Sequence, residues 1–332
     1  LAAVRTTVFG GIEPNPRLST IRAAGRVAVD EAVDVVVALG GGSAMDASKV
    51  IAALPAFEGE PWDMFDHGQS VVRWPEQALP IVTIPTLAAT GSEMNATAVV
   101  TNEVTSEKTY TWGECLYPRL ALVDPELTLT VPANQTAYGV TDLITHVTET
   151  YFNGVDNTPL QDRMCEGIIL TALEFGPRAV ANGADIEART QIQYASIMAL
   201  NGVVQAGCNP AFPVHGIEHV LSALHDIAHG AGLAILSPAW MRFAATHEPR
   251  KYESFAQRVF GVASAQQGID RLREFFASLG CPTRLSDAGI PASDIERIAR
   301  DAIRVNGHGQ GRIAGRPPLS EADVVAILRM CA

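Results

Sequence analysis

The sequence predicts an α/β N-terminal domain with a parallel, doubly wound sheet, followed by an all-α C-terminal domain. Two strand-like segments, 34–39 and 80–86, each run into a loop of small residues, and a helical pattern follows the first loop. Strand, loop and helix in that order are typical of parallel sheets whose ligand site lies at the carboxyl ends of the strands. After about residue 130 the apolar residues recur with the helical period instead. The length of 332 residues also favours two domains, which we place at 1–130 and 131–332.

The first loop is a candidate phosphate-binding loop. Residues 34–39 (DVVVAL) are expected to form a buried strand that leads directly into three glycines at 40–42. A helix is expected over 43–54, with Ser43 as its N-cap and Asp46 in its first turn, where an acidic side chain is favourable. Backbone N–H groups at such a helix start can bind a pyrophosphate. The loop lacks the GxGxxG fingerprint, so this prediction depends on its context.

The second half is expected to be helical throughout, because its apolar spacing stays near 3.6 and is broken only by proline and glycine. The boundary falls near DPELTLTVP at 124–132, and the Gly/Pro-rich segment GHGQGRIAGRPP is a connection before a last short helix. The predicted helices span residues 132–152, 159–181, 186–206, 213–223, 230–246, 250–261, 266–279 and 291–303.

Composition excludes several kinds of partner. A net charge of −12 argues against nucleic acid, which requires a dense basic surface. No apolar run approaches the ~18 residues of a membrane span. The five cysteines are scattered and have no CxxC spacing, which favours reduced thiols in a cytoplasmic protein.

Histidines are concentrated where a metal site is expected. His146 follows Asp142 by four residues, so both side chains share one face of a helix. His215 and His229 are fourteen residues apart, and a straight helix would separate them by roughly 21 Å. Ligands of one ion must each lie ~2 Å from it, so either these two histidines do not share an ion or the chain turns back between them. Asp226, Gly230 and Gly232 in HDIAHGAG favour the turn, which we adopt. One carboxylate and three imidazoles suit Fe²⁺ or Zn²⁺.

Other residues allow different interpretations. The His225–Asp226 pair beside further histidines leaves a metal-dependent hydrolase as an alternative, although that function would not explain the glycine loops. The only lysines are Lys49, Lys108 and Lys251, in a chain that otherwise uses arginine. In such a chain, a lysine is expected where a compact ammonium group is required.

Five segments together resemble the iron-containing alcohol dehydrogenases. Within that family the resemblance is best to the branch of NADPH-linked butanol dehydrogenases and broad-range aldehyde reductases. The resemblance runs over essentially the whole chain and implies the dehydroquinate synthase-like fold of that family. The segments are FGGIEPNP (9–16), GGGSAMDASK (40–49), PTLAATGSEMN (85–95), GVTDLITHVTETYF (139–152) and HGIEHVLSALHDIAHGAGLAIL (215–236).

The resemblance implies a role for individual residues. The metal ligands would be Asp142, His146, His215 and His229. His219 and Lys108 would lie near the nicotinamide as candidate catalytic residues, with His219 carrying a proton to solvent or positioning the ring. The cofactor would be bound by residues of both loops and two further positions: Asn15, Gly41, Gly42, Ser43, Asp46, Thr86, Leu87, Thr90, Asn95 and Lys108.

The resemblance also implies an activity: metal-dependent hydride transfer between NAD(P)H and a small primary alcohol or aldehyde, in a cytoplasmic homodimer. Fe²⁺ is expected rather than Zn²⁺, and NADP(H) rather than NAD(H). Family members begin with a further strand–helix unit, which we expect to be missing before Leu1, and a fragment without it would bind the cofactor weakly. Glycerol and lactaldehyde/propanediol dehydrogenases are alternatives within the superfamily. A dehydroquinate synthase would need phosphate-binding basic residues in the helical half, which we do not find.

Overall fold

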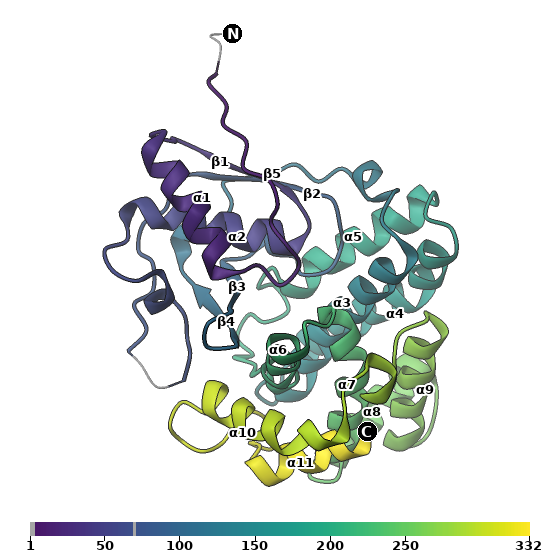
Figure 1. The fold of residues 1–332 in the computed structure, drawn as a ribbon. Coiled ribbons are helices and arrows are strands. Elements are labelled where there is room, and N and C mark those ends of the chain that lie inside the picture. The colour runs from purple at the N-terminus through teal and green to yellow at the C-terminus, as the bar shows by residue number, and fades with distance from the viewer. Residues whose placement is uncertain (1–3, 69–70) are drawn as a thin grey trace.

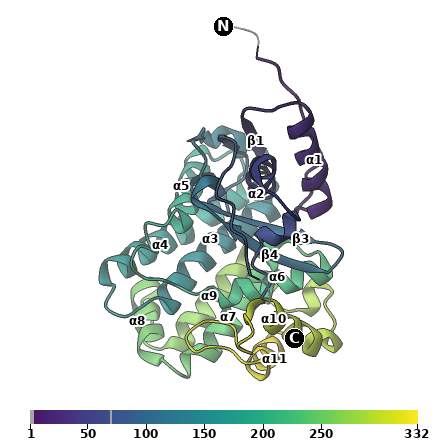
Figure 2. The same cartoon turned by 90° about the vertical axis from the view of Figure 1, so that its left-hand side faces the viewer.

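A computed structural model describes residues 4–68 and 71–332 and places a small parallel sheet beside a large group of helices (Figure 1, Figure 2). The sheet has the order β1-β2-β5, with β1 at Val36–Gly40, β2 at Ile81–Pro85 and β5 at Leu120–Ala121. β1 and β2 pair in parallel from Val36↔Ile81 to Gly40↔Pro85, which confirms the parallel sheet. Both predicted strands therefore end at the same edge, where their loops meet.

One face of the sheet is covered and the other is open. Helix α2 (Gly42–Ala53) packs against β1 and β2, and α1 (Leu18–Asp30) packs against α2. On the opposite face Val37 and Leu39 are 57% and 65% exposed. The helix layer of the described residues thus lies on one side of β1.

Helix α2 begins one residue earlier than the sequence indicated. Its N-cap is Gly41 rather than Ser43, and the first turn closes with a hydrogen bond from Met45 N to Gly41 O of 3.1 Å. The reason lies at Gly40, whose φ of +155° turns the chain sharply from strand to helix. A side chain is strained in that conformation, so a glycine is required at the strand end.

A hairpin that the sequence analysis did not predict stands between the sheet and the helices. Strands β3 (Thr97–Asn102) and β4 (Glu107–Trp112) pair antiparallel, with Thr101 opposite Lys108. Both strands are rich in β-branched and aromatic residues, which favour strands. The hairpin carries Lys108 toward α6, the helix that contains His215.

The C-terminal part is helical, as predicted. The main deviation is α5, which ends at Leu200 rather than 206, because Gly202 (φ +93°) takes the chain out of the helix. No membrane-spanning candidate occurs among the helices of the described residues. The helices are α3 (Ala133–Asn153), α4 (Pro159–Ala181), α5 (Ile186–Leu200), α6 (Pro213–His225), α7 (His229–Ala245), α8 (Pro249–Phe260), α9 (Ala265–Ser278), α10 (Ile295–Asn306) and α11 (Glu321–Met330).

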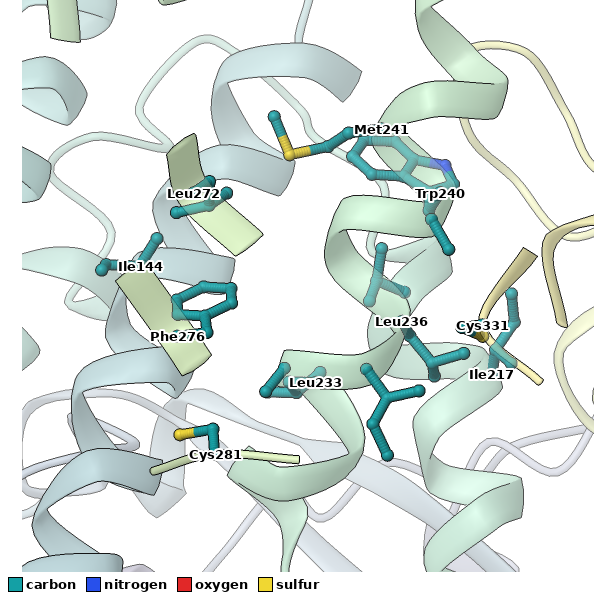
Figure 3. Close-up of a cluster of buried hydrophobic side chains, with 14 of the residues drawn as sticks. Ile144, Ile217, Leu233, Leu236, Trp240, Met241, Leu272, Phe276, Cys281 and Cys331 are labelled. Atoms are coloured by element: carbon teal, nitrogen blue, oxygen red, sulfur yellow. The ribbon is translucent and has the colours of Figure 1, made fainter. Parts of the chain in front are cut away.

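Helix α7 runs through the centre of this part. Figure 3 shows Leu233, Leu236 and Trp240 along α7, with Ile144 of α3 and Phe276 of α9 nearby. All five side chains are buried in one continuous apolar core. The interior of a protein is close-packed, so the first residue of α7, His229, is held in a fixed position relative to α3.

Candidate active site

Four predicted ligand residues converge on one point in the helical part. Asp142 and His146 lie one turn apart on α3, His215 lies near the start of α6, and His229 begins α7. The Nε2 atoms of the three imidazoles lie 3.6, 3.5 and 3.7 Å from Oδ1 of Asp142, for His146, His215 and His229 respectively. Two ligands at ~2.1 Å from one tetrahedral ion would be about 3.4 Å apart. The spacing therefore fits a single divalent ion.

The convergence depends on the turn between α6 and α7. Helix α6 ends at His225, and Asp226 takes the left-handed conformation with φ 50° as its C-cap. Helix α7 then begins at His229. The chain thus reverses within three residues and brings His229 back beside His215, with ring centroids 5.3 Å apart.

Unpaired buried atoms support a cation at this point. Within the described part of the chain, Oδ1 of Asp142 and Nε2 of His215 are buried and have no hydrogen-bond partner. Buried polar atoms are nearly always paired, and a cation bound to these two atoms, which lie 3.5 Å apart, would satisfy both. Burial disfavours the charge on Asp142, but His146, His215 and His229 outweigh it and hold its pKa below the usual range. Asp142 is therefore an anion at neutral pH, as a metal ligand must be.

A second group of acidic and histidine side chains is close by, formed by Glu218, His219 and His229. Glu218 accepts hydrogen bonds from Ser222 Oγ and His229 Nδ1 and pairs with Lys108 at 3.4 Å. Both of its carboxylate oxygens therefore already contact protein donors. We therefore assign this group to the surroundings of the first metal site rather than to a second metal.

A cavity of about 480 Å³ opens beside the ligands, between the α/β part and the helices. Of the predicted cofactor residues, Gly41, Thr86 and Leu87 do not line it. The predicted residues that do line it are Asn15, Gly42, Ser43, Asp46, Thr90, Asn95, Lys108, His146, His215, His219 and His229. One continuous cavity thus joins the glycine loop to three of the four metal ligands.

Other cavity residues were not found from the sequence. Tyr110 comes from the unpredicted strand β4, and Phe212 immediately precedes α6. Asn306, His308 and Ile313 come from the end of α10 and the Gly/Pro-rich segment, which the sequence analysis treated only as a connection. The signal available was a histidine between glycines in GHGQG, which is not specific enough to indicate a site.

Lys49 is buried against the second loop (residues 85–95) and does not line the cavity. Its ammonium group donates to Ser92 Oγ at 2.7 Å, Asn95 Oδ1 at 3.0 Å and the carbonyl of Thr97 at 2.8 Å. Asp46 accepts hydrogen bonds from Ser92 Oγ at 2.6 Å and from the Val99 N–H at 2.9 Å. These contacts fix the second loop to α2, so both loops form one rigid unit.

The burial of Lys49 predicts a pH dependence of stability. Burial lowers the pKa of Lys49 from 10.5 to about 8, against the opposing effect of Asp46. Between these values the unfolded chain binds a proton that the folded chain does not. The free energy of unfolding should therefore rise with pH, by roughly 3 kcal/mol across the window. Urea unfolding at about pH 8 and pH 10 should show most of this rise, about 2 kcal/mol, in the native sequence and in Lys251→Met, but not in Lys49→Met. An equal rise in Lys49→Met would contradict the assignment.

The His–Asp pair that suggested a hydrolase is used elsewhere. His225 Nε2 pairs with Asp294 at 3.4 Å, and Asp226 accepts from Arg17 at 2.7 Å and Asn15 at 3.1 Å. Neither residue lines the cavity. The two residues therefore connect structural elements and do not form part of the metal site.

Comparison with known families agrees with this geometry. Residues 1–125 match the model of the iron-containing alcohol dehydrogenases, and residues 136–331 match the C-terminal model of the same family. The chain belongs to the iron-containing alcohol dehydrogenase family. It is thus an oxidoreductase of the iron-type alcohol dehydrogenase class, as the resemblance of its motifs implied.

Relatives of this iron-containing alcohol dehydrogenase match over most of their length. A probable NADH-dependent butanol dehydrogenase of Bacillus subtilis is 41% identical, over 97% of this chain and 83% of that protein. The NADPH-dependent aldehyde reductase YqhD of Escherichia coli is 34% identical, over 92% and 79%. The crystal structure of the NADH-dependent butanol dehydrogenase A of Thermotoga maritima superposes with a TM-score of 0.92 at 38% identity, covering 97% of this chain and 82% of that one. The fold of this alcohol dehydrogenase is therefore that of the family.

Proposed function

We propose that this iron-containing alcohol dehydrogenase reduces small aldehydes to primary alcohols, and catalyses the reverse reaction, with a divalent metal held by Asp142, His146, His215 and His229. The observation that carries the proposal is the convergence of these ligands at one cavity with the glycine loop. Fe²⁺ is the proposed metal, because the nitrogen and carboxylate ligand set suits it and the family is named for it.

The chemistry of the reaction is divided between the bound groups and the chain. When bound, the metal supplies a Lewis acid and the nicotinamide supplies or accepts hydride. Gly42 and Ser43 at the start of α2 would face the pyrophosphate, where backbone N–H groups favour an anion. Asn15 holds Lys108 through its side-chain oxygen at 3.0 Å, which would fix this lysine beside the nicotinamide end of the cavity.

His219 is the proposed proton carrier. It lines the cavity, and its ring centroid lies 5.6 Å from that of His229. Burial, together with the charge of Lys108, lowers the pKa of His219 well below its usual value. His219 is therefore a neutral imidazole at physiological pH, able to accept a proton from an alcohol directly or through water.

The cofactor proposed is NADH. The resemblance of the motifs favoured NADP(H), but the relatives named as NADH-dependent share 38–41% identity with this chain, whereas the NADPH-dependent aldehyde reductase shares 34%. The ratio of kcat/KM for NADH to that for NADPH tests this choice. A ratio below one would restore the original expectation.

The substrate proposed is an unbranched aliphatic aldehyde such as butanal. The lining of the cavity includes the apolar residues Leu200, Phe212, Ile313 and Ala314. Apolar walls with a few polar groups are typical of small-molecule sites. Butanol dehydrogenases among the relatives support a chain of this length.

The test of the proposal is oxidation of NADH in the presence of butanal. We expect steady loss of NADH absorbance, abolished by prior chelation and restored by adding Fe²⁺ or Zn²⁺. A folded, metal-loaded protein that oxidises no NADH with any small aldehyde would refute the proposal. Hydrolysis of phosphate esters by the same preparation would instead favour the hydrolase alternative.

Three further expectations stay predictions. The domain division at 1–130 and 131–332 is supported by two separate apolar cores, one formed by residues within 18–116 and the other within 137–331. We also infer a homodimer and a cytoplasmic location. Sedimentation velocity tests the first of these two inferences, and fractionation of the source cells tests the second.

A further inference from the structure

A buried carboxylate connects a proposed metal ligand to a lysine of the α/β part. Glu218 lies on α6 and is completely buried. One of its oxygens, Oε2, forms a hydrogen bond with Nδ1 of His229 and lies 3.4 Å from Nζ of Lys108. The other oxygen accepts from Ser222 Oγ. Glu218 therefore contacts three polar side chains. It binds His229 through Nδ1, the ring nitrogen that does not face Asp142.

The negative charge of Glu218 lies beside the positive charge of Lys108, next to the proposed metal ligand His229. The Lys108 side chain is 4% exposed, and its Nζ lies 3.5 Å from Nδ1 of His229. Without Glu218, this ammonium charge would be buried next to a ligand of a divalent cation. Like charges at such distances repel strongly when water is excluded, and a buried charge that loses its partner is costly. Glu218 thus binds the His229 ring and also neutralises the charge of Lys108.

A second carboxylate offers a natural comparison. Glu149 on α3 is also completely buried, and it forms a hydrogen bond with Nδ1 of His215 and accepts from the Val214 N–H at 2.6 Å. Within the described residues, no lysine or arginine forms an ion pair with Glu149. Glu149 and Glu218 therefore hold their histidines in the same way, but only Glu218 also neutralises a buried lysine.

We propose that Glu218 is a positioning residue that directs Nε2 of His229 to the metal and shields the metal from the ammonium group of Lys108, so that the metal site and strand β4 are coupled. The proposal rests on the four-ligand metal site proposed above. A carboxylate on the outer nitrogen of a metal-bound histidine fixes the ring orientation and the tautomer. The shielding of Lys108 is the role that distinguishes Glu218 from Glu149.

The test is titration of the chelator-treated protein with Co²⁺, followed by the visible absorbance bands of the bound ion. We expect Glu149→Gln to weaken Co²⁺ binding about 10-fold, the loss typical of an outer hydrogen-bond partner. Glu218→Gln should weaken it about 100-fold, because the charge of Lys108 is then uncompensated. Adding Lys108→Met to Glu218→Gln should recover about 10-fold, whereas adding it to Glu149→Gln should recover nothing.

The outcomes separate this inference from the metal site itself. If the native sequence binds no Co²⁺, the four-ligand site is wrong. If it binds Co²⁺ and Glu218→Gln is no weaker than Glu149→Gln, or if Lys108→Met gives equal recovery in both backgrounds, the shielding role is wrong. A loss caused only by poor folding would not be reversed by a second substitution, so recovery in the Glu218→Gln background alone supports the inference. Circular dichroism of each variant confirms that the fold is retained.

Discussion

Replacing His215 with alanine is expected to reduce both bound metal and turnover to background. His215 supplies one of three imidazole nitrogens around Oδ1 of Asp142, and its Nε2 has no other partner within the described residues. Removal of a residue that hydrogen-bonds to a ligand weakens metal binding about 10- to 100-fold. Removal of a ligand itself should weaken metal binding further. Metal content of the purified protein and NADH oxidation with butanal measure the two effects together.

The matched control for this variant is His247→Ala. His247 is exposed near the end of α7, and the hydrogen bonds of its ring are to Thr246 and Phe243, so its loss should change neither quantity. Full turnover by a metal-free His215→Ala protein would show that the proposed ligand set is wrong. The same result would leave the family assignment intact, because that rests on the whole chain.

The second large effect is expected for Gly230→Ala. A methyl group at Gly230 would lie 2.2 Å from the carbonyl oxygen of Tyr138, which is backbone of α3 and cannot rotate away. Helix α7 must then move from α3, and it carries His229 while α3 carries Asp142. We expect loss of metal together with a destabilisation of about 1–3 kcal/mol or more, as for other overpacked cores. Thermal unfolding and metal content are the measurements.

Gly167→Ala is the control for this prediction. Gly167 lies within α4, and no atom would come within 4 Å of the added methyl group. Alanine favours the helix over glycine by about 1 kcal/mol, so this variant should be as stable as the native sequence or more so. A Gly230→Ala protein with native stability and full metal content would mean that α3 and α7 pack less closely than the structure has them.

The sequence predicted the helical half well because its apolar spacing is local information. Helices α3 and α4 lie within one residue of their expected bounds, and the distance argument correctly predicted a reversal before His229. The glycines named for that turn, Gly230 and Gly232, lie within α7 instead, and the chain turns at Asp226. The metal ligands could also be predicted from the sequence. The spacing of four residues on α3 and a reversal of the chain after α6 allow few arrangements in which the four side chains meet. The spacing of apolar residues along the chain does not predict which residues that are distant in sequence line the same cavity.

What escaped prediction depends on long-range packing. The hairpin β3–β4 was missed because the short segments TAVVTN and EKTYTW carry no strong turn signal between them. Glu149 and Glu218 were not singled out, because a glutamate on a helix is most often a solvated residue. Only the packing of α6 against α3 and α7 shows that both are buried against histidines. Asn306 and His308 reach the cavity from a segment far along the chain.

The open side of strand β1 determines how the sheet can be extended. Among the described residues β1 pairs only with β2, so one row of its backbone N–H and C=O groups has no ladder partner. Val37 and Leu39 stand exposed next to that row. A free edge beside apolar side chains is a template for another strand, whether from the same molecule or from a neighbour. Strand β1, which is longer than β5 at the other edge, is therefore the border where the sheet would be extended and where association at high protein concentration would begin.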